Sequence, residues 1–225
     1  MIGYGLTCEL TCDYGPGKVY PQTNGIGVVC GPGWIHYYSD PLLLFLLNPI
    51  NAGPSNTTIW EYEIGGIISD NVGLLCGCTE ATILRKIEHI QLTAEQRAKF
   101  GILCALEVYN EPKFVQWAKN WLVDNNRAFK TARDVSLDVM SNLTNYSGYS
   151  VTHVFYHFAN SEHAAGSAFY AARAAAYADP KANYLSYVDK DVAEAAYHAA
   201  SVKKIDTVVL AHKAMTDFLE GTDDE

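Results

Sequence analysis

The pattern of hydrophobic and polar residues changes near Leu92. Before this point, apolar and polar residues alternate between glycines and prolines, which is typical of short strands joined by turns. After it, apolar residues recur every three to four positions, which is typical of amphipathic helices. The sequence therefore predicts an α+β protein in which a small β-rich domain, residues 1–92, is packed on an all-α helical bundle, residues 93–225.

The first 92 residues predict several strands and one short buried helix. Asn24-Gly25 suits a type I′ hairpin turn, because both central positions of that turn need positive φ. Asp40 and Pro41 suit the start of a helix, with an N-cap acceptor and a proline at the first helical position. The apolar run that follows predicts a helix buried on all sides. The clearest predicted strands cover residues 34–38, 57–69 and 82–90.

The rest of the chain predicts six helices. Thr93 and Gln96 form the pattern of a capping box, so the first helix is expected to begin there. Ser150 and Asp189 are expected to cap the fourth and fifth helices. The other predicted helices are one after Pro112 and two over residues 126–143 and 204–219, and the fourth is expected to end near residue 178.

An alanine-tyrosine stretch runs through residues 164–200. It holds 15 alanines, and Tyr170, Tyr177 and Tyr184 are spaced seven residues apart. Alanine favours helix and lets helix backbones approach closely, so this stretch predicts tightly packed helices. A ladder of rings that stacks a ligand, or an interface between subunits, is the alternative interpretation.

The charge is acidic in both halves. The formal net charge is −9, with 3 Lys/Arg and 8 Asp/Glu in residues 1–92 and 13 against 17 in the remainder. An acidic chain without a basic run is a poor match for a phosphate backbone, so nucleic acid is not expected as a partner. A small nucleotide held in a local pocket is still compatible with this charge.

No targeting or membrane segment is predicted. The first ten residues contain Glu9 and lack a basic stretch before an apolar core, and the longest apolar run, residues 42–47, is too short to cross a bilayer. Six cysteines without a signal peptide are expected to be reduced thiols. We therefore expect a cytoplasmic protein that does not bind membranes.

Two groups of residues have partial metal-binding patterns. His153, His157 and His163 have the spacing of the zinc ligands in metzincin peptidases, but Val154 stands where the catalytic glutamate is needed. The cysteines could supply four thiolates, although their spacings depart from the usual zinc knuckle; they are Cys8, Cys12, Cys30, Cys76 and Cys78. We expect core or surface histidines, buried free thiols, no metal and no cofactor.

Glu61 and Glu63 alternate on a predicted strand that follows an aromatic strand, a layout similar to ADP-ribosyltransferases. Those enzymes place an arginine or histidine on an earlier strand. No arginine precedes Arg85, and His36 lies at the wrong point in the order. We expect two outward carboxylates and assign no catalytic residue.

The segments "CGPGWIHYYSDPLLLFLLNPINA", "IWEYEIGG" and "GLLCGCTEATILRKIEHIQLTAEQRAKFGILCALEVYNEPKFVQWAKNWL" resemble an uncharacterised family of bacteriophage and metagenomic proteins. In that family a β-rich domain of unknown function precedes an alanine-rich, immunity-protein-like helical region. The resemblance covers residues 30–127 and carries no known catalytic residues. It implies an accessory protein that acts in the cytoplasm of the infected bacterial host.

Three function classes follow. The first is a non-enzymatic counter-defence or host-modulating protein that binds a host or defence protein or sequesters a small, nucleotide-like signalling molecule. The second is a self-assembling structural or virion-associated protein, a homo-oligomer through its helical region. The third is an ADP-ribosyltransferase-like or other nucleotide-handling enzyme. We expect the first.

A ligand site, if the chain has one, is expected where the two predicted domains meet, because ligand sites favour domain junctions. The polar and aromatic residues expected to line it are His36, Tyr37, Tyr38, Trp60 and Glu61.

Overall fold

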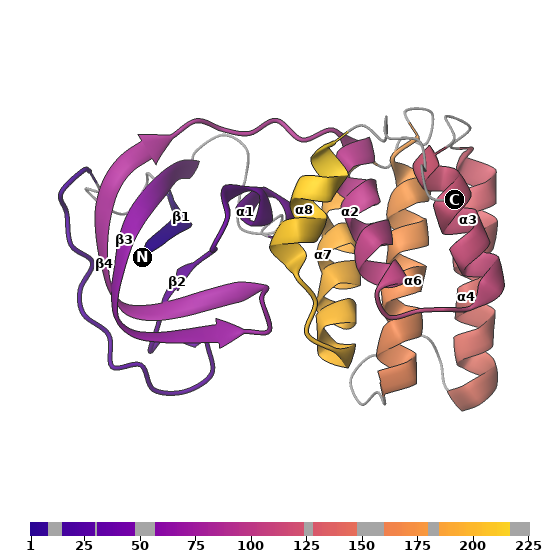
Figure 1. Cartoon of the computed structure of the whole chain (residues 1–225), viewed down its shortest axis with the longest axis horizontal. Helices are drawn as coiled ribbons and strands as arrows, with labels where there is room; N and C mark the ends of the chain where they lie inside the picture. Colours follow the sequence, from indigo (N-terminus) through magenta and orange to yellow (C-terminus); the bar gives the residue numbers. More distant parts are fainter. Residues whose placement is uncertain are drawn as a thin grey trace, which may run out of the picture. The chain divides into compact units, whose positions relative to one another are not determined.

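The chain forms a mixed α+β protein, with its sheet in the N-terminal part and most of its helices after it, as predicted (Figure 1). The computed structural model describes residues 1–8, 15–29, 31–47, 57–123, 128–147, 160–179 and 185–216. It divides into two compact units. The sheet unit comprises Met1–Leu92 with Asp206–Val208, and the helical unit comprises Thr93–Ile205 with Val209–Glu225.

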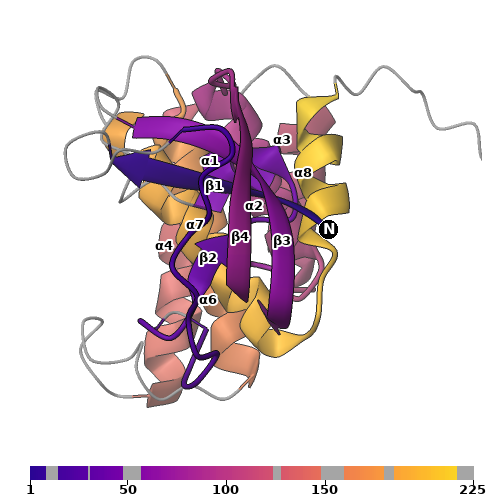
Figure 2. The same ribbon diagram turned by 90° about the vertical axis from the view of Figure 1, so that its left-hand side faces the viewer.

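The sheet unit contains four antiparallel strands in the order β1-β3-β4-β2 (Figure 2). The strands are β1 (Ile2–Cys8), β2 (Ile35–Tyr37), β3 (Thr57–Asn71) and β4 (Leu75–Ile87). The sheet curls until its two ends meet, because Tyr4 and Tyr38 exchange backbone hydrogen bonds of 2.9 and 2.8 Å. Large side chains fill the inside of this curl: Ile35, Tyr37, Trp60, Tyr62, Ile64, Cys78, Ala81 and Ile83.

Residues 17–23 cover the edge of β4 that β2 leaves open. The amide of Tyr20 donates to the carbonyl of Ala81 (2.9 Å), and the amide of Thr23 donates to that of Thr79 (3.1 Å). This pairing explains why the hairpin predicted at Asn24-Gly25 is wrong. Residues 17–23, before the turn, pair with β4 and not with the residues that follow it, and Gly25 keeps its positive φ of 64° within a loop.

Two glycines of β1 allow aromatic rings to lie against its backbone. A Cβ at Gly5 would lie 2.3 Å from Cε2 of Tyr62, and a Cβ at Gly3 would lie 2.4 Å from Cδ2 of Tyr37. Both tyrosines are almost completely buried, so their rings have little room to move away. The curl of the sheet therefore depends on the absence of side chains at these positions.

We expect Gly5→Ala to destabilise the sheet unit by about 1–3 kcal/mol, the usual range for overpacking a core. Gly15→Ala is the matched control, because a Cβ there would have no heavy atom within 4 Å. Urea unfolding followed by circular dichroism measures both variants. Equal stability of the two variants would contradict this account of the sheet.

The predicted buried helix is confirmed as α1 (Pro41–Leu47). Its N-cap is formed as expected, since the amide of Leu42 donates to Oδ1 of Asp40 at 2.8 Å. Leu43, Leu44 and Leu46 are at most 1% exposed. The ring of Phe45 meets that of His89, which follows β4, edge-on at 4.7 Å. This helix thus belongs to the core of the sheet unit.

In the helical unit, α6 and α7 pack on each other and both contact α2, and α4 packs on α6. The bounds are α2 (Ala94–Leu106), α3 (Pro112–Val123), α4 (Phe129–Ser147), α6 (Asn160–Tyr177) and α7 (Leu185–Val202); α8 (Thr207–Met215) begins within the sheet unit and lies mostly in the helical unit. Alanines at positions 168, 171, 172, 195, 196 and 199 are fully buried, so the alanine stretch lets these helices approach closely, as predicted.

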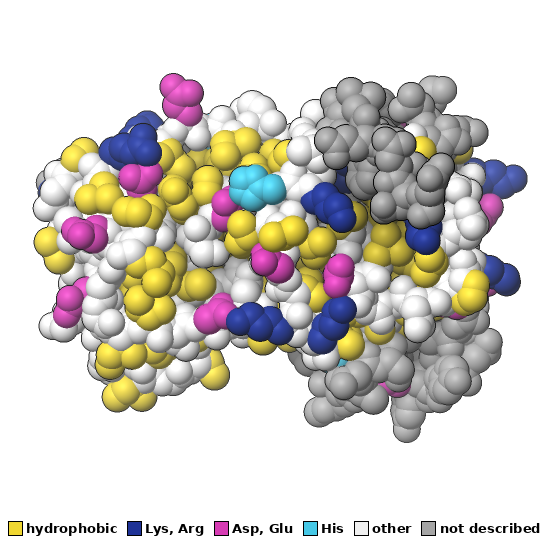
Figure 3. Space-filling model, viewed as in Figure 1, with side chains coloured by type: hydrophobic (Ala, Val, Ile, Leu, Met, Phe, Trp, Pro, Cys, Tyr) yellow, Lys and Arg dark blue, Asp and Glu magenta, His cyan; other side chains and the backbone are white. Residues whose placement is uncertain are grey.

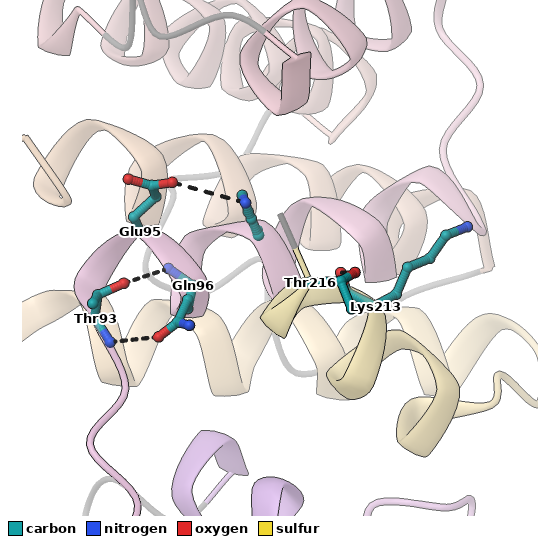
Figure 4. A network of polar contacts seen from close by, with 6 residues as sticks. Thr93, Glu95, Gln96, Lys213 and Thr216 are labelled. Atoms are coloured by element: carbon teal, nitrogen blue, oxygen red, sulfur yellow. Dashed lines mark hydrogen bonds and ion pairs between the residues drawn. The ribbon is translucent and has the colours of Figure 1, made fainter. Parts of the chain in front are cut away.

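The sequence predicted some helix ends correctly and others wrongly. The capping box at Thr93 is confirmed, with Thr93 N to Gln96 Oε1 at 2.9 Å and Gln96 N to Thr93 Oγ1 at 3.1 Å (Figure 4). The predicted cap at Asp189 is wrong, because α7 begins four residues earlier and Asp189 forms an ion pair with Arg97 (3.1 Å). The predicted cap at Ser150 lies outside the described residues. The predicted strand over 82–90 is the second part of β4, which begins at Leu75.

Candidate functional site

The five residues predicted to line a ligand site all lie in the sheet unit, but they have different surroundings. Tyr37 and Trp60 are 2% and 8% exposed and pack in the core inside the curled sheet. Tyr38 is also buried, and its backbone closes the sheet on Tyr4. Burial raises the pKa of Tyr37, so its hydroxyl stays protonated at neutral pH. These three side chains therefore have structural roles in the sheet.

His36 and Glu61 point away from that core, and each has a different partner. Nε2 of His36 lies 2.5 Å from the carbonyl oxygen of Val29, in the loop that precedes β2. The carboxylate of Glu61 accepts two hydrogen bonds from Arg85, on the neighbouring strand, at 2.7 and 3.2 Å. Glu61 thus forms a bidentate ion pair with Arg85, and His36 helps to hold the loop in place.

The described residues of that loop, 24–29 and 31–33, are fixed by hydrogen bonds from several directions. The amide of Gly25 donates to the carbonyl of Gly33 (3.0 Å), and the amide of Ile26 donates to Oδ1 of Asn24 (3.1 Å). Nε1 of the buried Trp34 donates to the carbonyl of Gly27 (3.2 Å). A Cβ at Gly33 would lie 2.2 Å from the carbonyl oxygen of Ile26, so the loop also depends on this glycine.

This fixed loop presents aliphatic side chains to solvent. Ile26 is 72% exposed and Val28 is 77% exposed. Ile67, on β3, is 61% exposed and lies beside the loop, because its Cδ1 is 3.6 Å from where a Cβ on Gly25 would be. We call these three residues, Ile26, Val28 and Ile67, the apolar loop surface. Hydrophobic side chains also gather in several groups on the face of the sheet unit drawn in Figure 3.

The position of Ile67 is fixed by a β-bulge. The pairing of β3 with β4 shifts between Gly65 and Ile68, and Gly66 has a φ of 69°. The amide of Ile67 donates to Oγ1 of Thr79 (2.9 Å). Bulges re-aim the side chains of the strand that carries them. Here the bulge exposes Ile67 beside the loop.

The helical unit holds a second cluster, between α6 and α7. Nδ1 of His163 lies 2.9 Å from Nδ1 of His198, which is only 3% exposed. Tyr170 stacks on the ring of His198, with centroids 5.5 Å apart and an interplanar angle of 14°. Burial, and then the charge of His163, lowers the pKa of His198 to about 4, so this ring is neutral at pH 7.

Roughly two to three helical turns away from the histidine pair, Arg173 of α6 binds Asp191 of α7. Nε of Arg173 donates to Oδ2 of Asp191 at 2.7 Å, and the other guanidinium nitrogen donates to Oδ1. Asp191 is fully buried, and the guanidinium lies over the rings of Phe169 and Tyr170 at 5.1 and 5.0 Å. Burial raises the pKa of Asp191, and the hydrogen bonds and charge of Arg173 offset part of that rise.

The thiols of β4 and the hydroxyl beside the histidine pair are not activated as nucleophiles. Burial raises the pKa of Cys76, and it raises that of Cys78 to about 11. Ser167, beside the histidine pair, donates its hydroxyl proton to the carbonyl of Ala195 (2.8 Å). A thiol with a raised pKa is a poor nucleophile at neutral pH.

The sequence-predicted metal patterns are resolved only in part. His163 is described and faces His198, whereas His153 and His157 lie outside the described residues, as do Cys12 and Cys30. Within the described ranges, no group of three or more His, Cys, Asp or Glu side chains is arranged to hold a metal ion.

Sequence reasoning missed the apolar loop surface and the pairing of His163 with His198. A local signal for the first was present in "NGIGVV", where aliphatic residues alternate with glycines in a segment too rich in glycine to form a stable strand. No local signal pointed to the second, because the two histidines are 35 residues apart.

Comparison with known proteins gives no match to a protein family model, to a curated protein or to a solved structure. In the part of the chain that the structure describes, no helix is long and apolar enough to span a membrane.

Proposed function

We propose that this chain is an accessory binding protein of bacteriophage origin that acts without catalysis in the cytoplasm of the infected host. In this proposal it binds a host or defence protein through the apolar loop surface. In the same proposal the helical unit is a bundle with a structural role. The resemblance of residues 30–127 to a phage and metagenomic family supports the origin, and the exposed loop supports the mode of action.

The observation that carries the proposal is the exposure of Ile26 and Val28 on a loop that is itself well fixed. A single exposed aliphatic residue is ordinary, but neighbouring ones on an ordered loop are typical of contact sites. A loop that is already ordered loses little conformational entropy on binding, which favours affinity. Truncating these side chains should therefore remove binding and leave the fold intact.

Charge indicates which partner surface would suit this loop. Residues 1–92 hold 8 acidic and 3 basic residues, and one of the basic ones, Arg85, is already paired with Glu61. An apolar contact within an acidic unit is complementary to an apolar patch bordered by lysine or arginine. Binding to such a partner would weaken as the salt concentration rises.

We expect the double variant Ile26→Ser/Val28→Ser to lose partner binding by about tenfold or more, because each truncated contact contributes roughly 1 kcal/mol or more at an interface. Affinity capture from bacterial lysate, with quantitative mass spectrometry, compares the variant with the unchanged protein. Val123→Ser is the matched control, since Val123 is 74% exposed on α3. The proposal fails if the double variant captures the same proteins as the control at equal yield.

A second candidate function, self-assembly through the helical region, is favoured by two tyrosines on α7. Tyr187 and Tyr197 are 53% and 52% exposed, and tyrosine is enriched at protein interfaces. Sedimentation velocity across a range of concentrations decides this candidate. A mass that rises with concentration supports it, and a constant monomer mass rejects it.

A further inference from the structure

The histidine pair between α6 and α7 brings two nitrogen ligands to one point. Nδ1 of His163 and Nδ1 of His198 are 2.9 Å apart, and the ring centroids are 5.1 Å apart. One of these nitrogens must carry the proton of the hydrogen bond, and the lone pair of the other accepts it. Two imidazole nitrogens aimed at each other across a helix interface are also the arrangement that a bridging metal ion uses.

Neighbouring residues hold the ring of His198 in place. A Cβ at Gly166 would lie 3.1 Å from Nδ1 of His198, so the absence of a side chain there makes room for the ring. Tyr170 stacks on one face of it, and Tyr197 meets it edge-on at 5.7 Å. The hydrogen bond from Ser167 to the carbonyl of Ala195 ties the two helices together beside the pair. A ligand held in this way is positioned before a metal ion arrives.

We propose that His163 and His198 bind a divalent transition metal ion of the zinc type through their Nδ1 atoms and so cross-link α6 to α7. Zinc binds imidazole nitrogen at about 2.0–2.1 Å, so two ligands at a tetrahedral angle are separated by roughly 3.3–3.4 Å. The present separation of 2.9 Å needs to open by only a few tenths of an ångström. Water supplies the remaining ligands in this proposal.

Metal binding rearranges one proton without releasing it. Both Nδ1 lone pairs must face the ion, so the ring that now donates the hydrogen bond moves its proton from Nδ1 to Nε2. The hydrogen bond between the rings is lost, and two metal–nitrogen bonds replace it. Because only two protein ligands take part, the affinity should be modest and the ion exchangeable. The bound ion would stabilise the folded helical unit by mass action.

The first test is a Zn²⁺ titration of the full chain by isothermal calorimetry, with the cysteines kept reduced. We expect saturable binding of one ion and a rise in the thermal midpoint that a chelator reverses. His163→Ala should weaken the binding at least tenfold, while His212→Ala, an exposed histidine on α8, should leave it unchanged. His153→Ala/His157→Ala should also leave it unchanged, which separates this site from the spaced histidine motif of the sequence.

The second test needs no variant and therefore covers the case in which His163→Ala fails to fold. Nitrogen NMR of the histidines in the unchanged protein should show two Nδ1 signals shifting together as Zn²⁺ is added. Co²⁺ gives an independent check, because its visible spectrum separates imidazole from thiolate ligands. The proposal is overturned if no Nδ1 signal moves, if the spectrum shows thiolate ligands, or if His153→Ala/His157→Ala abolishes the binding that His163→Ala retains.

Discussion

Arg173→Met is expected to destabilise the helical unit by about 3–5 kcal/mol, more than any other single change to this ion pair. The variant leaves the carboxylate of Asp191 without its guanidinium partner at a position that has no exposure to solvent. A buried charge without a partner must either remain desolvated or bind a proton, and both carry a free-energy cost at pH 7. Methionine keeps much of the volume of the arginine side chain, so the loss of stability reflects the removal of the positive charge and not a cavity.

Removing the acidic partner of the ion pair should destabilise the helical unit less than removing Arg173. Asp191→Asn removes the carboxylate and leaves the guanidinium of Arg173, whose side chain is 31% exposed and can turn toward water. We expect this variant to lose about 2 kcal/mol, below the range for a completely buried pair. If Arg173→Met loses more stability than Asp191→Asn, the burial of the Asp191 carboxylate, and not only the loss of the ion pair, determines the effect.

Urea unfolding at pH 7 measures both variants against Asp138→Asn, which removes a pair on the surface. Lys113 and Asp138 are 3.9 Å apart, with side chains 79% and 49% exposed, so this control should change stability by less than about 1 kcal/mol. Because burial raises the pKa of Asp191, the stability difference between Arg173→Met and the unchanged protein should become smaller as the pH falls toward 5. An equal loss in both variants, or a difference that does not become smaller, would contradict this account.

The stability of the unchanged helical unit is expected to fall by about 3 kcal/mol as the pH is lowered from 6.5 to 4, through His198 alone. In the unfolded chain this histidine binds a proton below pH 6.5, whereas in the folded chain its pKa is about 4. The unfolded state therefore binds more protons across this window, so acid favours unfolding. Well above pH 6.5 the ring is neutral in both states and contributes no slope.

Other groups titrate in the same window, so the informative quantity is a difference. The free energy of unfolding is measured at several pH values, with a chelator present, for the unchanged protein and for His198→Gln. The curve for the unchanged protein should fall more steeply between pH 6.5 and 4, and the two curves should run parallel above pH 7. Parallel curves throughout would show that His198 is not shielded from protonation in the folded protein.

The elements that the sequence predicted well are those with short-range causes. The capping box at Thr93 and the N-cap at Asp40 depend on contacts within three residues, and both are present. The strand β3 was also predicted, because alternation of apolar and polar residues is visible without knowing the partner strand. In each case the determining interaction lies inside the window in which the pattern is seen.

The features that were missed depend on residues far apart in the chain. The closure of the sheet pairs Tyr4 with Tyr38, and the contact of Gly5 with the ring of Tyr62 joins β1 to β3. The glycines of β1 lie against aromatic rings, a role that no neighbouring residue in the sequence indicates. Asn24-Gly25 shows the converse, since its local composition favours a hairpin and the pairing of the preceding residues 17–23 with β4 overrides it.

The surroundings of the predicted ligand residues also depend on contacts that the sequence does not show. His36, Tyr37 and Tyr38 are consecutive in sequence, yet alternation along the strand sends Tyr37 into the core and His36 out toward the loop. Tyr37 and Trp60 therefore lie together in the core, whereas His36 lies on the other side of the strand. The segment "NGIGVV" carried a local signal for two residues of the apolar loop surface, but the place of Ile67 beside them depends on the β-bulge of β3.

Site-specific photo-crosslinking in bacterial cells tests the central claim most directly. A photoreactive amino acid is placed at position 28, in the apolar loop surface, and, in a separate sample, at position 123 as an equally exposed control. The account predicts a discrete crosslinked partner protein from position 28 that is absent from position 123 and is lost when Ile26→Ser is added. No crosslink at position 28, or the same crosslinks from both positions, would contradict the claim that this loop is the binding surface.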